Sequence, residues 1–212
     1  MISLFIDTSY HNLIVGLYKG LKEIAYDIQE NDNQLSTRLL PLIEANLKKA
    51  NITVKDIDKI FVVNGPGSFT GIRIGVATVK TLGWTLNKKV VPISELEFLA
   101  TAKTEKKYIL PLIDARRGYV YAGFYENDLG VLQKDKYINL NDMLKKIEKK
   151  YNMDEVEIVS YDEFPDIDAN RPKIRVEKIL EKYIEKEGLE AHQVNPNYLK
   201  KTEAEEKKNS KH

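Results

Sequence analysis

Residues 4–9 read LFIDTS, and residues 111–116, about 105 positions later, read PLIDAR. Each stretch ends an apolar run on an aspartate, which is typical of a buried strand that reaches a turn. A second strand-like run follows each of them, LIVGLY at 13–18 and YVYAGFY at 119–125. The two halves of the chain therefore open with the same predicted hairpin.

The elements after each hairpin also repeat in order. A third strand, a helix, a fourth strand and a second helix are predicted at 21–28, about 35–50, 58–64 and about 70–86, and again at 131–138, about 140–151, 155–160 and about 175–187. The order β-β-β-α-β-α, occurring twice, predicts a duplicated α/β fold. Two such halves facing across a cleft describe the actin-like, sugar-kinase-like and Hsp70-like ATPase (ASKHA) architecture, an analogy of fold that does not fix function.

The expected domain boundaries follow from this repeat. We expect an N-terminal ASKHA-like domain at 1–103 and a shortened C-terminal ASKHA-like domain at 104–199. The remaining stretch, 200–212, reads KKTEAEEKKNSKH and is dominated by charged residues. Such a composition cannot bury a core, so we expect a disordered charged tail.

Composition limits the classes of function. The 212 residues are 42% apolar and 31% charged with a net charge of +1, which fits a soluble globular protein and not an autonomous, strongly basic nucleic-acid binder. The absence of cysteine excludes disulfides, thiolate metal sites and a cysteine nucleophile. The first apolar run is too short for a signal peptide, and no stretch is long enough to span a membrane, so we expect a cytoplasmic protein.

The ends of the two opening strands carry candidate magnesium ligands, Asp7 and Asp114. The residues alone favour the alternative that each aspartate caps its own hairpin turn. The first turn, DTSYHN, has no glycine to admit a phosphate. Nucleotide-binding members of this architecture carry a Gly-Gly turn in the second half, but no glycine occurs between Gly130 and Gly188, where 161–176 takes that place. Strong catalytic binding of ATP by this chain alone is not expected.

Metal and nucleophile chemistry find no better support. The three histidines, His11, His192 and His212, form no H-x-x-x-H pair. The sequence has no G-x-S-x-G nucleophile elbow. We therefore predict no catalytic residue and no metal site, with His11 in a turn and His212 in the tail.

The glycine-rich stretch NGPGSFTGIRIG at 64–75 joins a strand to a helix. Pro66 directs the preceding residue away from helical geometry, and Ser68 or Thr70 can cap the helix that follows. A helix start exposes free N–H groups, so an anion could bind there, although the lysine of a Walker A loop is absent. The candidate anion or nucleotide contacts are Asp7, Thr8, Ser9, Gly65, Gly67, Ser68 and Asp114.

Gly71 and Gly75 lie four residues apart on one face of that helix. Interior glycine costs a helix about 1 kcal/mol relative to alanine, so the pair indicates close approach by a sheet, a helix or a partner chain. The 35–50 helix, which Ser36 or Asn33 could cap, carries a broad apolar stripe. We interpret the two helices as a partner-binding surface, although burial of both faces within the subunit fits the pattern equally well. The predicted interface residues are Leu39, Ile43, Leu47, Gly71, Arg73, Gly75, Thr78 and Leu82.

The chain resembles the TsaB (YeaZ) family over about residues 1–125. The matching strings are IDTS (6–9), QLSTRLLPLI (34–43), NGPGSFTGIRIGVATVKTLGW (64–84), VVPISELEFLA (90–100) and LIDARRGYVYAGFY (112–125), and VNPNYLKK (194–201) is similar to the family's terminal P-x-Y-L-R. The long glycine-rich string is the most specific of them. The match fades through 126–190.

The resemblance implies a non-catalytic subunit in the synthesis of threonylcarbamoyladenosine (t6A) at position 37 of tRNA. It implies a heterodimer with the catalytic paralogue TsaD through the N-terminal helices, recruitment of the ATPase TsaE, and a homodimer when the subunit is alone. Contact with the tRNA would be made through the complex. No cofactor is expected to bind tightly, but ATP or ADP with Mg could lie at the complex interface. The alternatives are an independent ATP-dependent phosphotransferase or ATPase of the actin-like superfamily and, with no support from the residues, a hydrolase.

Overall fold

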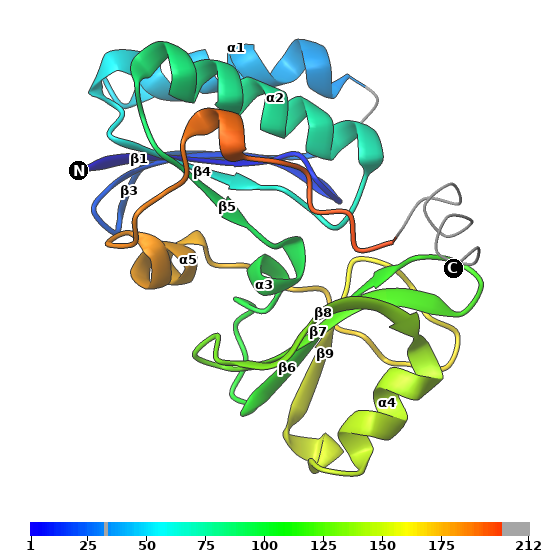
Figure 1. Cartoon of the computed structure of the whole chain (residues 1–212). Helices are drawn as coiled ribbons and strands as arrows, with labels where there is room; N and C mark the ends of the chain where they lie inside the picture. The colour runs from blue at the N-terminus through cyan, green and yellow to red at the C-terminus, as the bar shows by residue number, and fades with distance from the viewer. Residues whose placement is uncertain (32–33, 201–212) are drawn as a thin grey trace.

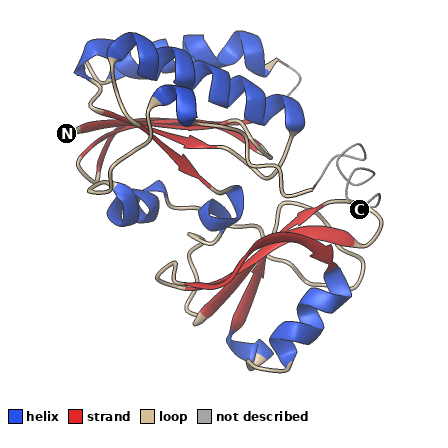
Figure 2. Ribbon diagram, in the orientation of Figure 1, coloured by secondary structure: helices blue, strands red, loops and turns tan. Residues whose placement is uncertain are grey.

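The computed structural model describes residues 1–31 and 34–200, so most of the predicted tail lies outside the described residues. Its strands form a 5-stranded sheet in the order β3-β2-β1-β4-β5 and a 4-stranded sheet in the order β8-β7-β6-β9. Figure 2 shows helices packed against both sheets. No helix within the described ranges is both long and apolar enough to cross a membrane.

The first half contains the predicted meander and both predicted helices. In β1–β3 each strand runs antiparallel to the next, and β4 and β5 then extend the sheet in parallel from β1. The strand β5 and the short helix α3 were not predicted. The elements are β1 (Ile2–Asp7), β2 (Asn12–Lys19), β3 (Lys22–Glu30), α1 (Leu35–Lys49), η1 (Val54–Asp56), β4 (Lys59–Val63), α2 (Phe69–Leu86), β5 (Val90–Ile93) and α3 (Glu95–Leu99).

The central strand β1 is buried on both faces. Leu4 and Ile6 enter the core beneath α1 and α2, whereas Phe5 packs on Phe98 of α3 with 4.9 Å between the ring centroids. A strand buried on both faces reads as a continuous apolar run, which explains why this strand is recognisable in the sequence. Figure 1 shows α1 and α2 side by side over one face of the sheet, with α3 and a later helix, α5 (Val176–Tyr183), beneath the other.

The two long helices begin differently. The helix α2 follows Ser68, whose hydroxyl oxygen accepts an N–H of the first turn at 3.2 Å, so the Ser68 cap is confirmed and Thr70 lies inside the helix. The helix α1 follows Gln34, whose side chain forms no capping hydrogen bond. The predicted Ser36 cap is wrong because Ser36 is already the second helical residue. The alternative cap, Asn33, lies outside the described residues.

The second half repeats the first. The strand β6 pairs antiparallel with β7 and parallel with β9, as β1 does with β2 and β4. The order β-β-β-α-β-α therefore occurs twice, and the predicted α/β fold with duplicated halves is confirmed. Its elements are β6 (Tyr108–Asp114), β7 (Tyr119–Glu126), β8 (Val131–Asn139), α4 (Leu140–Glu148), η2 (Met153–Glu155), β9 (Val156–Val159), α5 (Val176–Tyr183) and η3 (Ala191–Gln193).

The end of the chain returns to the first sheet. The apolar face of α5 shares a core with Phe5 and Phe98. Further along, Leu189 forms a β-bridge with Val90 of β5, and η3 lies against α2 (Figure 1). The predicted second domain, 104–199, thus contains a segment that packs on the first sheet, and the division after residue 103 stays a prediction.

Candidate functional site

The β1–β2 turn fills the glycine-rich cradle that was predicted to receive an anion. Thr8 and Ser9 in this turn are fully buried. The carbonyl oxygen of Ser9 accepts the N–H of Ser68 at 2.6 Å, so a donor at the start of α2 is already used. A Cβ added at Gly67 would lie 2.1 Å from the same oxygen. The backbone of the chain itself therefore takes the place that a phosphate would need.

Gly71 and Gly75 of α2 make room for Thr8. A Cβ at Gly71 would lie 2.0 Å from the Thr8 carbonyl oxygen, and one at Gly75 would lie 2.5 Å from Thr8 Oγ1. The Thr8 hydroxyl donates a hydrogen bond to the Gly71 carbonyl at 2.7 Å. Close approach is thus present, but the neighbour is a turn of the same chain. Thr8 therefore accounts for both glycines, which are buried within the subunit, and their place in a partner interface stays a prediction.

The other predicted interface residues differ in exposure. Leu39, Ile43 and Leu47 form the sheet-facing stripe of α1 and are buried in its core. On α2, Arg73 is exposed, and Thr78 and Leu82 are partly buried. The broad apolar stripe read from the sequence therefore serves mainly the subunit's own core.

A different set of residues covers the solvent side of these helices. Leu40 of α1 is 57% exposed, and Phe69 and Trp84 of α2 are 55% and 74% exposed. Phe69, Arg73, Ala77 and Trp84 are all exposed and follow helical spacing, so they share one face of α2. We call Leu40, Phe69, Ala77 and Trp84 the outer helix face. Large apolar side chains thus remain exposed on the solvent side of both helices.

Asp7 and Glu95 form a buried pair of carboxyl groups joined through Ser9. The Ser9 hydroxyl lies 2.9 Å from Asp7 Oδ1 and 2.8 Å from Glu95 Oε2, and the Ser9 N–H donates to Asp7 Oδ1 at 2.7 Å. Burial raises the pKa of Asp7 to about 6. Burial, and then the charge of Asp7, raise the pKa of Glu95 well above its ordinary value. The pair thus keeps a proton where exposed carboxyls are ionised, so Asp7 is poorly placed to hold magnesium.

Aromatic side chains occupy the space between the halves beside this pair. Tyr161, in the loop after β9, stacks on His11 with 4.6 Å between ring centroids and meets Tyr10 edge-on at 5.7 Å. Arg171 Nη2 lies 3.1 Å from His11 Nε2. The 161–176 segment therefore packs against the first hairpin through Tyr161 and Arg171. His11 lies in the β1–β2 turn, as predicted.

Asp114 caps its own hairpin and is exposed at the end of β6. Its Oδ1 accepts the Arg116 N–H at 2.8 Å, and its own N–H donates to Asp162 Oδ2 at 2.6 Å. Gly65 is buried beside the carbonyl of Asn197. Within the described part of the chain, no group of three His, Asp or Glu side chains could hold a metal ion. The structure thus does not bring the predicted anion contacts together as an open site.

Two features of this region were not predicted from the sequence. Glu95 follows Ser94, which caps α3, and an acid in the first turn of a helix ordinarily reads as a favourable surface residue. Nothing in that pattern reveals its burial beside Asp7. Trp84 did carry a signal, because it is the single tryptophan of the chain and lies off the buried stripe of α2.

Comparison with known proteins gives a consistent family. The model described as "TsaD: tRNA N6-adenosine threonylcarbamoyltransferase" matches residues 29–176. The Bacillus subtilis (strain 168) "tRNA threonylcarbamoyladenosine biosynthesis protein TsaB" is 37% identical over 154 residues, 71% of this chain and 67% of that protein. The protein of the same name from Buchnera aphidicola subsp. Schizaphis graminum is 36% identical over 161 residues, 71% of this chain and 76% of that protein.

Two solved structures share the fold over almost their whole length. "YeaZ from Pseudomonas aeruginosa" superposes with a TM-score of 0.72 at 23% identity, covering 93% of this chain and 99% of that one. An uncharacterized protein from Pseudomonas aeruginosa "with similarity to peptidase YEAZ" gives 0.75 at 22% identity, covering 94% and 99%. At this level of identity the likeness establishes the fold alone.

Proposed function

This chain belongs to the TsaB family of tRNA threonylcarbamoyladenosine biosynthesis proteins, and from that premise we propose that it is a non-catalytic subunit that pairs with a TsaD-like transferase. The family name indicates a role in the biosynthesis of threonylcarbamoyladenosine in tRNA. The pairing and the lack of independent chemistry are supported by the chain's own residues.

The contacts around Asp7 and Ser68 support the proposal that the subunit has no ATP site of its own. Such a site needs accessible carboxylates for magnesium and free N–H groups for phosphate. Here Asp7 is buried beside Glu95, the N–H of Ser68 is used by Ser9, and Tyr161 stacks on the first hairpin. These contacts close the positions that an actin-like ATPase keeps open.

Calorimetry with Mg-ATP on the isolated chain tests this part of the proposal. We expect no micromolar binding and no turnover, because the phosphate and magnesium positions are occupied by the chain itself. Micromolar binding with turnover that Asp7→Ala abolishes would contradict the non-catalytic assignment.

The outer helix face carries the proposed pairing. Trp84, at 74% exposure, is the observation on which this assignment rests, because exposed tryptophans on a helix are the residues that most often dominate protein interfaces. Phe69 of α2 and Leu40 of α1 are further exposed apolar side chains on these helices. We therefore keep the contact on the two predicted helices but assign it to their solvent side.

Replacing Trp84 by glutamate tests the pairing. Trp84→Glu should weaken binding to a co-expressed TsaD protein at least about tenfold, since it buries a charge at the centre of the contact. Co-purification and size-exclusion chromatography measure it. Val131→Glu is the matched control, because Val131 is also an exposed apolar residue but lies on β8 of the second half. Full co-purification of Trp84→Glu would remove the outer helix face from the interface.

The proposal extends to the rest of the assembly. The outer helix face would form a homodimer when the transferase is absent, and the ATPase TsaE would join the heterodimer. We propose no tightly bound cofactor for the chain alone, with ATP or ADP and magnesium at the interface of the complex. Because tRNA is the substrate, we propose a cytoplasmic location.

A further inference from the structure

The turn between β6 and β7 holds two arginines in a backbone conformation that suits them poorly. Arg116, Arg117 and Gly118 have φ values of +68°, +57° and +74°. Glycine and asparagine are the residues that accept this left-handed region in hairpin turns, whereas a long side chain with a Cβ is disfavoured there. The backbone conformation of the turn therefore does not explain why arginines occur at these two positions. Residues in disfavoured conformations often have a functional role.

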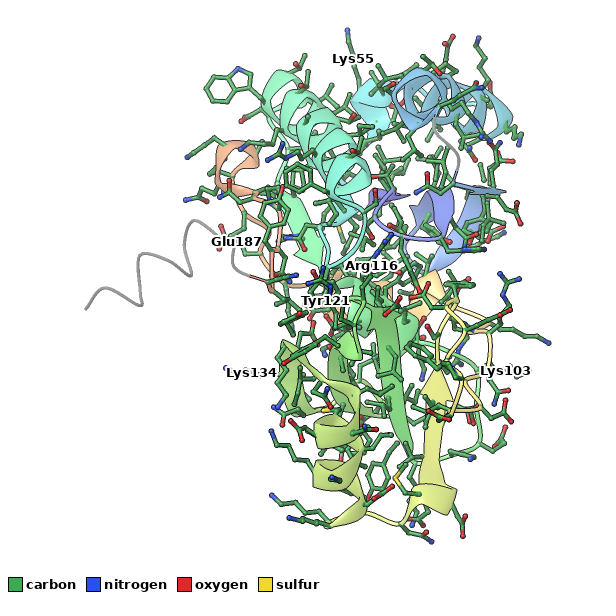
Figure 3. The ribbon with its side chains drawn as sticks, turned by 90° about the vertical axis from the view of Figure 1, so that its right-hand side faces the viewer. Lys55, Lys103, Arg116, Tyr121, Lys134 and Glu187 are labelled. Carbon is green, nitrogen blue, oxygen red and sulfur yellow. The ribbon has the colours of Figure 1, made fainter. Side chains whose placement is uncertain are left out.

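Both arginines present their charge to solvent. Arg116 and Arg117 are exposed, and within residues 1–31 and 34–200 neither guanidinium has an ion pair or a ring contact. The acid of the turn, Asp114, uses Oδ1 to accept the backbone N–H of Arg116. Figure 3 shows Arg116 near Tyr121, at the level where the two halves meet.

Tyrosine rings lie directly beside this turn. Tyr119, which follows it on β7, stacks on Tyr137 of the edge strand β8 with 4.8 Å between centroids and 11° between planes. Tyr121 tilts against the same ring at 5.8 Å. Tyr119 is 39% exposed, so it offers surface beyond its contact with Tyr137. Lys200 Nζ lies 5.2 Å from the Tyr137 ring centroid, which adds a cation to the stack.

Lys136 does not belong to this cluster. It precedes Tyr137 on β8 and pairs with Ala122, so its side chain lies on the opposite face of the sheet, toward Lys146 of α4. The cations beside the tyrosine rings are therefore those of the turn and of Lys200.

We propose that Arg116, Arg117, Tyr119, Tyr137 and Lys200 form an RNA-binding rim that holds the phosphodiester backbone and stacks a base on Tyr119. Cations interleaved with exposed aromatic rings are the arrangement that recognises RNA, because phosphates need positive charge and every base has a flat face. An acidic peptide would pair with the cations, but it would not stack on the exposed tyrosine rings. This inference rests on the proposed function, in which tRNA is the substrate, and it assigns direct tRNA contact to this subunit.

Replacing both arginines by asparagine tests the rim. Asparagine accepts the left-handed backbone, so Arg116→Asn/Arg117→Asn should fold with an unchanged or raised Tm. Binding of a fluorescent tRNA transcript, followed by anisotropy across a salt series, should weaken about tenfold. The slope of log affinity against log salt should flatten by about 2, one for each lost phosphate contact. Lys149→Asn/Lys150→Asn is the control, since it removes the same charge at the opposite end of α4.

The outcomes separate the rim from the proposed function. Unchanged affinity and salt slope in the arginine variant, or an equal loss in the Lys149/Lys150 control, would overturn the rim. Competition by polyglutamate as effective as that by tRNA would show a general polyanion surface and overturn the RNA assignment. The anisotropy is measured on the full chain alone and with TsaD. A wild-type chain that binds RNA through the arginines but never pairs with TsaD would refute the proposed function and leave the rim intact.

Discussion

At the scale of single residues, Thr8 determines which side chains α2 can carry. The Cβ of Gly75→Ala would meet Thr8 Oγ1, which the variant Thr8→Ala removes. We expect Gly75→Ala to lower the free energy of unfolding by about 1–3 kcal/mol in the wild-type background and by clearly less in Thr8→Ala. Urea unfolding of the two single variants and the double variant measures the coupling.

Gly71 provides the matched contrast. The Cβ of Gly71→Ala would meet the backbone oxygen of Thr8, which no side-chain substitution removes. Its cost should therefore be the same with and without Thr8→Ala. Equal coupling at both glycines would show that the clash geometry is not the cause. A bulky residue at Gly75 would disturb the fold in the same way, so this position cannot serve as a probe of the partner interface.

The buried carboxyl pair makes stability depend on pH. The pKa of Asp7 rises from 3.8 to about 6, and that of Glu95 rises well above 4.5, so the folded state holds a proton that the unfolded state releases. This contribution to the free energy of unfolding is complete below about pH 4 and is lost as the pH rises through about 6. Glu95→Gln should flatten the decline and raise stability at pH 8 by roughly 1–3 kcal/mol relative to wild type.

Urea unfolding at pH 5 and pH 8 checks this expectation. Burial also raises the pKa of Asp135, but that group is present in both proteins and cancels in the difference between them. Glu163→Gln is the control, because Glu163 is exposed. A decline between pH 5 and pH 8 that Glu95→Gln leaves unchanged would exclude the pair as its source.

At the scale of elements, the start of α2 depends on one hydroxyl. Ser68→Ala removes the side chain that accepts an N–H of the first turn, and should lower the free energy of unfolding by about 1 kcal/mol. Ser36→Ala, inside the first turn of α1, should change it by only a few tenths of a kcal/mol because Ser36 caps nothing. Thermal unfolding of the two variants compares them. Equal losses would mean that the cap of α2 is not the relevant contact.

The observed helices and strands differ in how well the sequence predicted them. Strands such as β1 and β6 and the helices α1 and α2 were predicted within a few residues, because apolar periodicity is a local property. The strand β5 was missed because its four residues, VVPI, are too few to show a period. The use of the α1 stripe could not be predicted, since Leu39 and Leu40 are neighbours in sequence but face the core and solvent respectively. Glu95 and Thr8 depend on contacts across the fold, which no local pattern records.

At the scale of the whole molecule, a partly buried ion pair ties α5 to the first half. Glu97 of α3 is buried and accepts from Lys182 Nζ at 2.6 Å and from the Tyr183 hydroxyl at 2.9 Å, both on α5. Lys182→Met leaves the carboxylate without its cation and should lower the free energy of unfolding by about 3 kcal/mol. The double variant Glu97→Gln/Lys182→Met should recover part of that loss.

Guanidinium unfolding of these variants measures the pair. Lys22→Met, an exposed lysine on β3, is the control for loss of one positive charge. A Lys182→Met variant as stable as that control would show that α5 is held by its apolar face alone.

Because the end of the chain packs on the first sheet, the first half can complete its packing only late in synthesis. The residues of the outer helix face are made early, but Gly83, one position before Trp84, rests on Ala191, and a Cβ added there would lie 2.9 Å from that side chain. The core shared by Phe5 and α5 likewise stays open until the last helix is made. A nascent chain on the ribosome therefore lacks part of the packing of its first half until it has been translated through η3.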